Sequence, residues 1–195
     1  STTAIFTKLN APSKAVRVAA EQAISTSELS WTILRPTMIY GAPGDRNMER
    51  LIRYLERMPF IPLPGGGRNL QQPVHVDDLA ATIANTASLP PGDNSAFDVP
   101  GPEPLTFADV VRHTAAALGR RRLVVPTPVA PMRWAVRQQE RLLRQPRLSA
   151  EQIDRLLENK VFDPRPAMAS LSHAPRPFSE GIGHEVAVVA DTVPK

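Results

Sequence analysis

The sequence predicts an α/β protein with a mostly parallel sheet. Short apolar segments rich in β-branched residues alternate with segments of helical spacing along the 195 residues, and parallel strands need such helical crossovers. The first strand is expected over Thr32-Ile-Leu34 and ends at Arg35 or Pro36, because proline lacks the N–H that a sheet ladder uses. We expect a ligand beside the loop that follows, since open α/β sheets bind ligands outside the carboxyl ends of their strands.

The other elements follow the same two periodicities. Segments with apolar or small residues at helical spacing are the predicted helices, and they are 11–27, 47–58, 78–87, 107–118, 132–144 and 150–159. Further short apolar segments are the predicted strands, and they are 72–76, 96–99 and 123–125.

Proline, glycine and polar residues mark the boundaries of these elements. Asp77 is the expected N-cap of one helix, and Gly119 is in the position of a C-cap glycine. Residues 62–67 are expected to form a turn-rich loop. The proline-rich remainder after residue 159 is expected to be extended, because the 21 prolines of the chain gather where elements end.

Composition excludes several classes of protein. Cysteine is absent, which excludes disulfides, thiolate metal sites and thiol nucleophiles. The formal charge is only +4 and aromatic residues make up 5% of the chain, so we expect no nucleic-acid partner. The histidines lack metal-ligand spacing, and no metal is expected. No apolar run approaches the roughly 20 residues of a membrane span, and the N-terminus lacks the order of a signal peptide, which favours a cytoplasmic location.

Several separate segments, in this order and at this spacing, resemble the extended and atypical short-chain dehydrogenase/reductases, the NAD-dependent epimerase/dehydratase family in the broad sense. They are 1–6, Ser13-Lys14, 34–41, 73–80, 97–107 and 175–181. The resemblance implies the C-terminal part of a Rossmann-type parallel sheet joined to a small α/β substrate-binding satellite domain. The Rossmann remnant would comprise 1–41 and 70–90, and the satellite domain 42–69 and 91–195.

The family's Gly-rich loop, which holds the dinucleotide pyrophosphate, has no counterpart in this sequence. Gly65-Gly-Gly67 precedes a predicted strand and does not open a helix after one. We therefore expect a C-terminal portion of a longer protein. The complete parent would bind NAD or NADP, and this chain alone would bind it weakly or not at all.

The resemblance also assigns catalytic positions. Thr3, or failing it Thr2, matches the hydroxyl residue that orients the substrate oxygen, and Lys14 matches the lysine of the Tyr-x-x-x-Lys pair. Asn10 stands where the tyrosine is expected. An amide cannot exchange a proton near neutral pH, so the usual acid/base is missing. The alternative for Lys14 is a solvated helix lysine.

The remaining assignments concern the cofactor and the substrate. The resemblance places Pro36, Thr37, Met38 and Ile39 along the nicotinamide. The alternative is that Pro36 simply ends the strand and that its neighbours are core residues. Gln71 replaces an arginine that meets the diphosphate in nucleotide-sugar epimerases, which weakens that substrate class. Tyr40 is a candidate substitute base or a packing residue. His75 is a candidate substrate contact or a hydrogen-bonded strand histidine. Asp77 and Asp78 are interpreted as the N-cap and first turn of a helix rather than as a pair of metal ligands.

The sequence thus predicts part of an NAD(P)-dependent epimerase/dehydratase-like protein with a small-molecule substrate. Asn10 and Gln71 keep a second hypothesis open, a non-catalytic NAD(P)-sensing or scaffold subunit, similar to NmrA-like sensors and to the dehydrogenase-like accessory subunit of mitochondrial complex I. The arginine-rich segment Arg133–Arg147 could contact an anionic membrane or an acidic partner, or simply present a solvated face.

Overall fold

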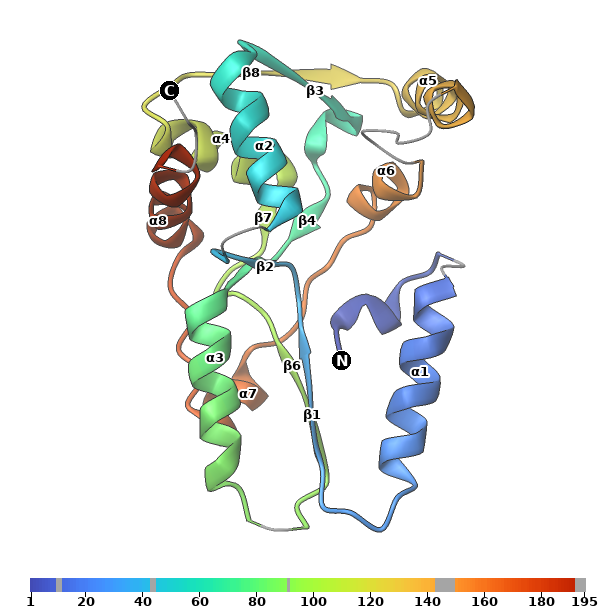
Figure 1. Ribbon diagram of the computed structural model, residues 1–195, viewed down its shortest axis with the longest axis vertical. Helices are drawn as coiled ribbons and strands as arrows, with labels where there is room; N and C mark the ends of the chain where they lie inside the picture. The colour runs from blue at the N-terminus through green and yellow to red at the C-terminus, as the bar shows by residue number, and fades with distance from the viewer. Residues whose placement is uncertain (10–11, 43–44, 91, 143–149, 192–195) are drawn as a thin grey trace.

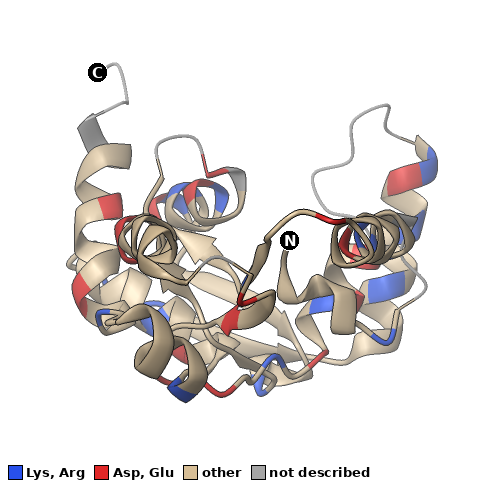
Figure 2. Ribbon diagram, turned by 90° about the horizontal axis from the view of Figure 1, so that it is seen from below, with Lys and Arg blue, Asp and Glu red and all other residues tan. Residues whose placement is uncertain are grey.

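The structure is a computed structural model that describes residues 1–9, 12–42, 45–90, 92–142 and 150–191 (Figure 1). Among these residues, none of the helices combines the length and the apolar character needed to cross a bilayer. Basic and acidic residues are interspersed along the elements in the view of Figure 2.

The lower half of the molecule in Figure 1 is built on a parallel strand pair. Strand β1 (Thr32–Pro36) lies beside β6 (Ser95–Val99). Helix α1 (Pro12–Ser25) lies on one side of the pair in this view, and α3 (Val76–Asn85) and α7 (Arg165–Leu171) lie on the other. The alternation of helices and strands thus yields the crossovers that parallel pairing requires.

Burial and ion pairs hold this half together. The guanidinium of Arg35 at the end of β1 is 2.7 Å from the carboxylate of Glu21 on α1. The side chains of the buried core on the other side of the strands are Val74, Leu79, Phe97, Val99, Ala167 and Leu171.

The upper half contains a second parallel pair covered by helices. Strand β3 (Phe60–Pro64) lies beside β8 (Leu123–Thr127). Helices α2 (Arg46–Arg57), α4 (Phe107–Ala117) and α8 (Phe178–Asp191) pack on one another. Their shared core includes Met48, Ile52, Val110, Phe178, Ile182 and Val186.

Short elements join the two halves. Strand β2 (Ile39–Tyr40) pairs in parallel with β5 (Val74–His75), and β4 (Leu70–Gln71) pairs antiparallel with β7 (Leu105–Thr106). The other described elements are helices α5 (Val129–Leu142) and α6 (Ala150–Leu156) and the 3₁₀ turns Thr3–Phe6, Gly65–Gly67 and Thr86–Ser88.

The predicted α/β class with mostly parallel pairing is confirmed, since three of the four strand pairs in the described chain are parallel. The Thr106 hydroxyl accepts from the Asp109 N–H as the N-cap of α4, and Gly119 has a φ of 65° after that helix. β6 lies in the range predicted for the satellite domain yet pairs with β1, and the division into two domains stays a prediction.

Three local predictions are wrong. Residues 60–64 form β3 although 62–67 was expected to be a loop; its prolines are tolerated because β3 has a single strand neighbour and needs few ladder donors. The N-cap of α3 is His75, whose Nδ1 accepts from the N–H of Asp77. The remainder after residue 159 contains the two helices α7 and α8, because its apolar residues find a tertiary core.

Candidate functional site

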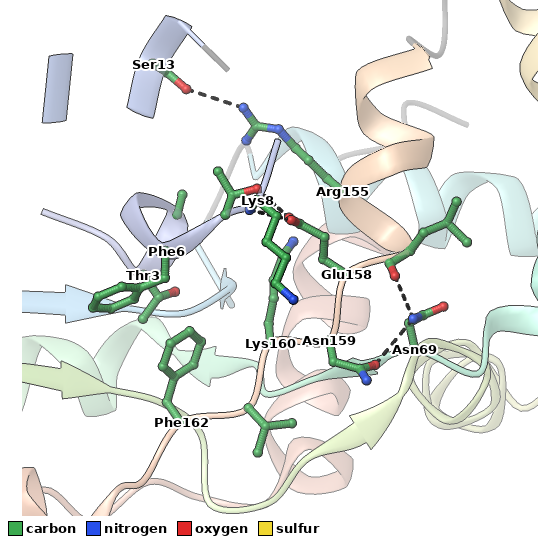
Figure 3. A pocket seen from close by; sticks show the side chains of 14 residues that line it. Thr3, Phe6, Lys8, Ser13, Asn69, Arg155, Glu158, Asn159, Lys160 and Phe162 are labelled. Carbon is green, nitrogen blue, oxygen red and sulfur yellow. Dashed lines mark hydrogen bonds between the residues drawn. The ribbon is translucent and has the colours of Figure 1, made fainter. Parts of the chain in front are cut away.

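A cleft of about 470 Å³ lies between the N-terminal segment and the segment that follows α6 (Figure 3). Its size falls within the range of small-molecule sites. Its lining residues are Thr3, Ala4, Phe6, Thr7, Lys8, Ser13, Asn69, Arg155, Leu157, Glu158, Asn159, Lys160, Val161 and Phe162.

The wall formed by residues 157–162 is fixed by hydrogen bonds to residues 69–72. The Asn69 amide donates to the Leu157 carbonyl at 2.6 Å, and the Gln71 amide donates to the Glu158 carbonyl at 3.2 Å. The backbone N–H of Lys160 donates to the Leu70 carbonyl at 2.8 Å, and that of Phe162 donates to the Gln72 side-chain oxygen at 2.9 Å. This segment therefore has a defined path although it is neither helix nor strand.

The opposite wall is tied to the end of β1. The hydroxyls of Thr2 and Thr3 both donate to the Pro36 carbonyl, each at 3.2 Å. Thr3 is buried and lines the cleft. The cleft thus begins at the carboxyl end of a parallel strand, the position where open α/β sheets bind ligands.

Positive charge predominates among the ionisable side chains of the cleft. Lys8, Arg155 and Lys160 line it, and Glu158 is the acidic lining residue. Both Glu158 oxygens accept hydrogen bonds, one from the Thr7 hydroxyl and one from the Lys8 backbone N–H at 2.8 Å. Burial lowers the pKa of Lys160, with Glu158 opposing the effect and Arg155 adding to it.

Two aromatic rings flank one side of the cleft. The ring centroids of Phe6 and Phe162 are 5.8 Å apart with an interplanar angle of 36°. The Arg35 guanidinium lies 5.3 Å from the Phe6 centroid, within the distance of a cation–π contact. An apolar or planar ligand group can pack here while its polar groups face the lysines.

The predicted catalytic residues are partly brought together. Lys14 lies one residue beyond Ser13 of the cleft lining, and its ammonium donates to the Thr7 carbonyl at 2.5 Å. Thr3 lines the cleft directly. Asn10, at the position of the expected tyrosine, lies outside the described residues.

The predicted nicotinamide loop is largely buried and uses its polar groups internally. Pro36 and Thr37 are buried, whereas Ile39 is exposed. The Thr37 hydroxyl donates to the Gln72 carbonyl, and the Met38 carbonyl accepts from the Val74 N–H at 2.9 Å. The loop follows β1 directly, and its contact with a cofactor stays a prediction.

Tyr40 and His75 belong to a buried cluster apart from the cleft lining. Their rings meet edge to face with centroids 5.1 Å apart, and Tyr40 also contacts Phe178 at 4.8 Å. Burial raises the pKa of the Tyr40 hydroxyl and lowers the pKa of the His75 imidazole. This placement favours the packing alternative for Tyr40. His75 accepts a hydrogen bond at Nδ1 from the Asp77 N–H, while its buried Nε2 has no partner among the described residues.

Glu185 completes this cluster from α8. Its carboxylate is buried and accepts from the Gly41 N–H at 3.0 Å. Burial raises the pKa of Glu185 to about 7, and the Gly41 hydrogen bond opposes the shift. Sequence reasoning missed this group.

The acidic pair after β5 has a structural role. The carboxylate of Asp78 accepts from the Arg176 guanidinium at 2.7 Å and from its backbone N–H at 2.8 Å. Asp77 lies in the first turn of α3. Within the described part of the chain, no three His, Asp or Glu side chains are arranged to hold a metal ion.

The arginine-rich segment is described only as far as Leu142. Arg133 is paired with Asp154 of α6, whereas the Trp134 and Leu142 side chains are largely exposed. The end of the segment, up to Arg147, lies outside the described residues, and a membrane or protein contact there stays a prediction.

Sequence reasoning missed the residues of the far wall. Lys160 and Phe162 follow α6 without a recognisable motif, and the family pattern assigns no role to Arg155. Lys8 precedes the predicted catalytic helix without a pattern of its own. Residues 69–72 bind the segment after α6, and Glu158 of that segment accepts hydrogen bonds from Thr7 and Lys8 of the N-terminal segment.

Comparison with curated proteins finds partial matches. The chain is 30% identical over 129 residues to NADH dehydrogenase [ubiquinone] 1 alpha subcomplex subunit 9 of Arabidopsis thaliana, which covers 63% of this chain and 31% of that protein. It is also 30% identical over 105 residues to UDP-glucose 4-epimerase of Vibrio cholerae, and this match covers 53% of this chain and 31% of that protein. The chain thus spans about a third of the length of these relatives. No protein-family model matches it.

Solved structures match over nearly the whole chain. UDP-glucuronic acid 4-epimerase from Bacillus cereus, in complex with UDP-glucuronic acid and NAD, superposes with a TM-score of 0.70 at 15% identity over 99% of this chain and 60% of that one. UDP-glucose 4-epimerase of Thermus thermophilus, in complex with NAD, gives 0.62 at 21% identity over 92% and 53%. The fold is that of the extended short-chain dehydrogenase/reductases. The resemblance predicted from the sequence motifs is therefore confirmed.

The match covers part of each extended short-chain dehydrogenase/reductase chain, in keeping with the expected C-terminal portion. On this fold, Thr3 and the Pro36 carbonyl are joined by a hydrogen bond, and Lys14 in the first turn of α1 donates to the Thr7 carbonyl, which follows the turn that contains Thr3. Two of the positions that the motifs assigned independently, Thr3 and Pro36, are thus in contact at the end of β1.

Proposed function

We propose that this chain forms the substrate side of an NAD(P)-dependent epimerase/dehydratase-like protein and that its cleft binds a small polar substrate beside the nicotinamide. The observation that carries the proposal is the pair of hydrogen bonds from Thr2 and Thr3 to the Pro36 carbonyl. They join the cleft to the loop after β1, where ligands of this fold class bind.

The residues at hand fit the nicotinamide side of a dinucleotide. Lys14 donates to the Thr7 carbonyl, and an ammonium has two further donors for ribose hydroxyls. Residues 36–39 would line the nicotinamide, which supplies hydride chemistry when bound. Both structural relatives described above are complexes with NAD. Because the sequence has no Gly-rich phosphate loop, we expect weak dinucleotide binding by the chain alone.

Titration of the isotope-labelled chain with NADH, followed by NMR, tests this proposal. We expect a Kd of about 1 mM or weaker, with shifts at Thr2, Thr3, Lys14 and 36–39. Lys14→Met should reduce the shifts, whereas Arg165→Gln, which alters an exposed arginine elsewhere, should leave them unchanged. Shifts confined to other regions contradict the proposal.

A second candidate is a non-catalytic subunit that binds the nucleotide without turning it over. The observation that favours it is the lack of a phenol: the sequence has two tyrosines, and neither Tyr40 nor Tyr54 lines the cleft. With Asn10 at the tyrosine position, the usual proton transfer has no donor. The similarity to a complex I subunit points in the same direction.

The variant Asn10→Tyr separates the two candidates. The variant is made in the complete parent protein. If this residue limits catalysis, the variant gains a substrate-dependent change in nicotinamide absorbance while its NADH affinity is unchanged. Binding of NADH with no turnover in either form favours the non-catalytic subunit. Asn10→Phe is the matched control, because it adds the ring without the hydroxyl.

A further inference from the structure

We propose that the cleft recognises an anionic group, a carboxylate or a phosphate, through the ammonium groups of Lys160 and Lys8. The remainder of the ligand would pack against Phe6 and Phe162. This inference rests on the proposed function, because it names the substrate class of the same cleft, and the substrate would be a small organic acid or phosphate with an apolar or planar body.

The first argument is the state of the charged groups in the cleft. Glu158 is already engaged by the Thr7 hydroxyl and the Lys8 backbone N–H. Arg155 is held by Glu151, with contacts of 2.6 and 3.0 Å. Neither the Lys8 nor the Lys160 ammonium has an ion-pair partner in the part of the chain that the structure describes. Two cations that face one cavity without carboxylate partners leave room for an external anion.

The second argument is the environment of Lys160. Leu157, Val161 and Phe162 in its wall are apolar, whereas Glu158 and Asn159 are polar. Burial lowers the pKa of Lys160, and Glu158, whose oxygens already accept two hydrogen bonds, only partly opposes the shift. An unpaired ammonium in such surroundings is unfavourable, and an incoming anion relieves the penalty. Electrostatic attraction is also stronger here than at an exposed lysine, because the local dielectric constant is lower.

The third argument is the arrangement of the two walls. Lys8 comes from the N-terminal segment and Lys160 from the segment after α6, and both side chains extend into the opening in Figure 3. Phe6 and Phe162 approach from the same two segments, with centroids 5.8 Å apart. A ligand with an acidic end and an apolar end can therefore contact both segments at once.

The fourth argument concerns position 71. The Gln71 side chain is 2% exposed and donates to the Glu158 carbonyl, on the backbone of the cleft wall. It is absent from the lining, so it offers the ligand no donor. Anion recognition in this chain would come from Lys160 and Lys8 at the walls, while Gln71 holds one of those walls in place.

The test compares three probes of similar shape, phenyl phosphate, benzoate and neutral benzyl alcohol, by calorimetry and NMR titration of the chain. We expect the two anions to bind with shifts at Phe6, Lys8 and Phe162, and benzyl alcohol to bind at least about tenfold more weakly, since a charge-assisted hydrogen bond contributes that much. Phenyl phosphate binding stronger than benzoate binding identifies the phosphate class, and the reverse identifies the carboxylate class.

The variant Lys160→Met tests the assignment, because methionine keeps an apolar chain of similar length without the charge. It should weaken the preferred anion about tenfold and leave benzyl alcohol binding unchanged. Lys8→Met is the second variant, in case Lys160→Met alters the fold. Arg112→Gln, which removes an exposed charge from α4 outside the cleft, should have no effect.

Equal binding of the anions and benzyl alcohol, or anion binding that survives both lysine substitutions, overturns the inference. So does the failure of all three probes to shift the cleft residues. The proposed function is judged separately by NADH shifts at 36–39 and Lys14. Those shifts can persist when the anion preference is lost, so the two failures are distinguishable.

Discussion

Two glycines of α8 provide a matched test of how tightly this helix packs on β2. Gly181 faces the buried cluster: a Cβ there would lie 2.2 Å from the Tyr40 hydroxyl oxygen and 3.0 Å from the His75 ring. A Cβ at Gly183, two residues further on, would meet nothing within 4 Å. Because both glycines are in the same helix, the two alanine variants share the same gain in helix propensity, about 1 kcal/mol.

The difference between the variants therefore measures steric overlap. Overpacking a well-packed core costs about 1 to 3 kcal/mol. The cost for Gly181→Ala should reach the upper end, since Tyr40 is 0% exposed and is enclosed by His75 and Phe178. We expect Gly181→Ala to lower the free energy of unfolding by about 2 kcal/mol net and Gly183→Ala to raise it by about 1 kcal/mol.

Thermal and urea unfolding of the two variants measure these values. For a chain of this size, the melting temperature should fall by about 4 to 8 °C for Gly181→Ala and rise by about 2 to 4 °C for Gly183→Ala. Tyr40→Phe should relieve part of the penalty, because it removes the atom at 2.2 Å and leaves the ring carbon at 2.9 Å. Equal stability of the two alanine variants would refute the packing of α8 described above.

Three further predictions concern other parts of the chain. The folded-state pKa of Glu185 is raised from 4.5 to about 7, so its stabilising contribution is present below pH 4.5 and is lost as the pH rises to about 7. Urea unfolding should show this loss of stability, roughly 3 kcal/mol, in the unsubstituted chain and in Glu180→Gln but not in Glu185→Gln. The same dependence of stability on pH in all three would contradict the prediction. Gln71→Ala removes the hydrogen bond to the Glu158 carbonyl and should destabilise the chain by about 1 to 3 kcal/mol. It should also increase hydrogen exchange at the Lys160 amide. Unchanged protection of that amide would contradict the role of Gln71 in holding the wall. Because burial lowers the pKa of Lys160 below the ordinary 10.5, benzoate affinity should fall as the pH rises, at a midpoint below 10.5, and this component should vanish in Lys160→Met.

Much of the fold could be predicted from the sequence because its signals are local. β1, α1, α2 and α4 begin and end within a few residues of their predicted bounds, and Gly119 follows α4 as expected. The same reasoning gave a wrong prediction for the proline-rich end of the chain, which contains α7 and α8. Phe178, Ile182 and Val186 are spaced as one face of α8, yet the prolines before them suggested an extended chain.

The candidate site divides in the same way. Motif spacing led to Thr3, Lys14 and Pro36. The structure joins Thr3 to Pro36 at the end of β1 and Lys14 to the carbonyl of Thr7. The cationic wall could not be predicted, because Lys160 is 152 residues from Lys8 along the chain and no local pattern links them. Side-chain hydrogen bonds from residues 69–72 hold the segment that brings them together.

The sequence by itself determined the α/β class, the family resemblance and the absence of a tyrosine at the position of the expected acid/base, because each of these is written in residue identity and spacing. Only the tertiary structure decided that Tyr40 and His75 pack in a buried cluster while Lys8 and Lys160 face one cavity. Burial and long-range hydrogen bonds make that distinction, and both depend on contacts between segments that are far apart in the chain.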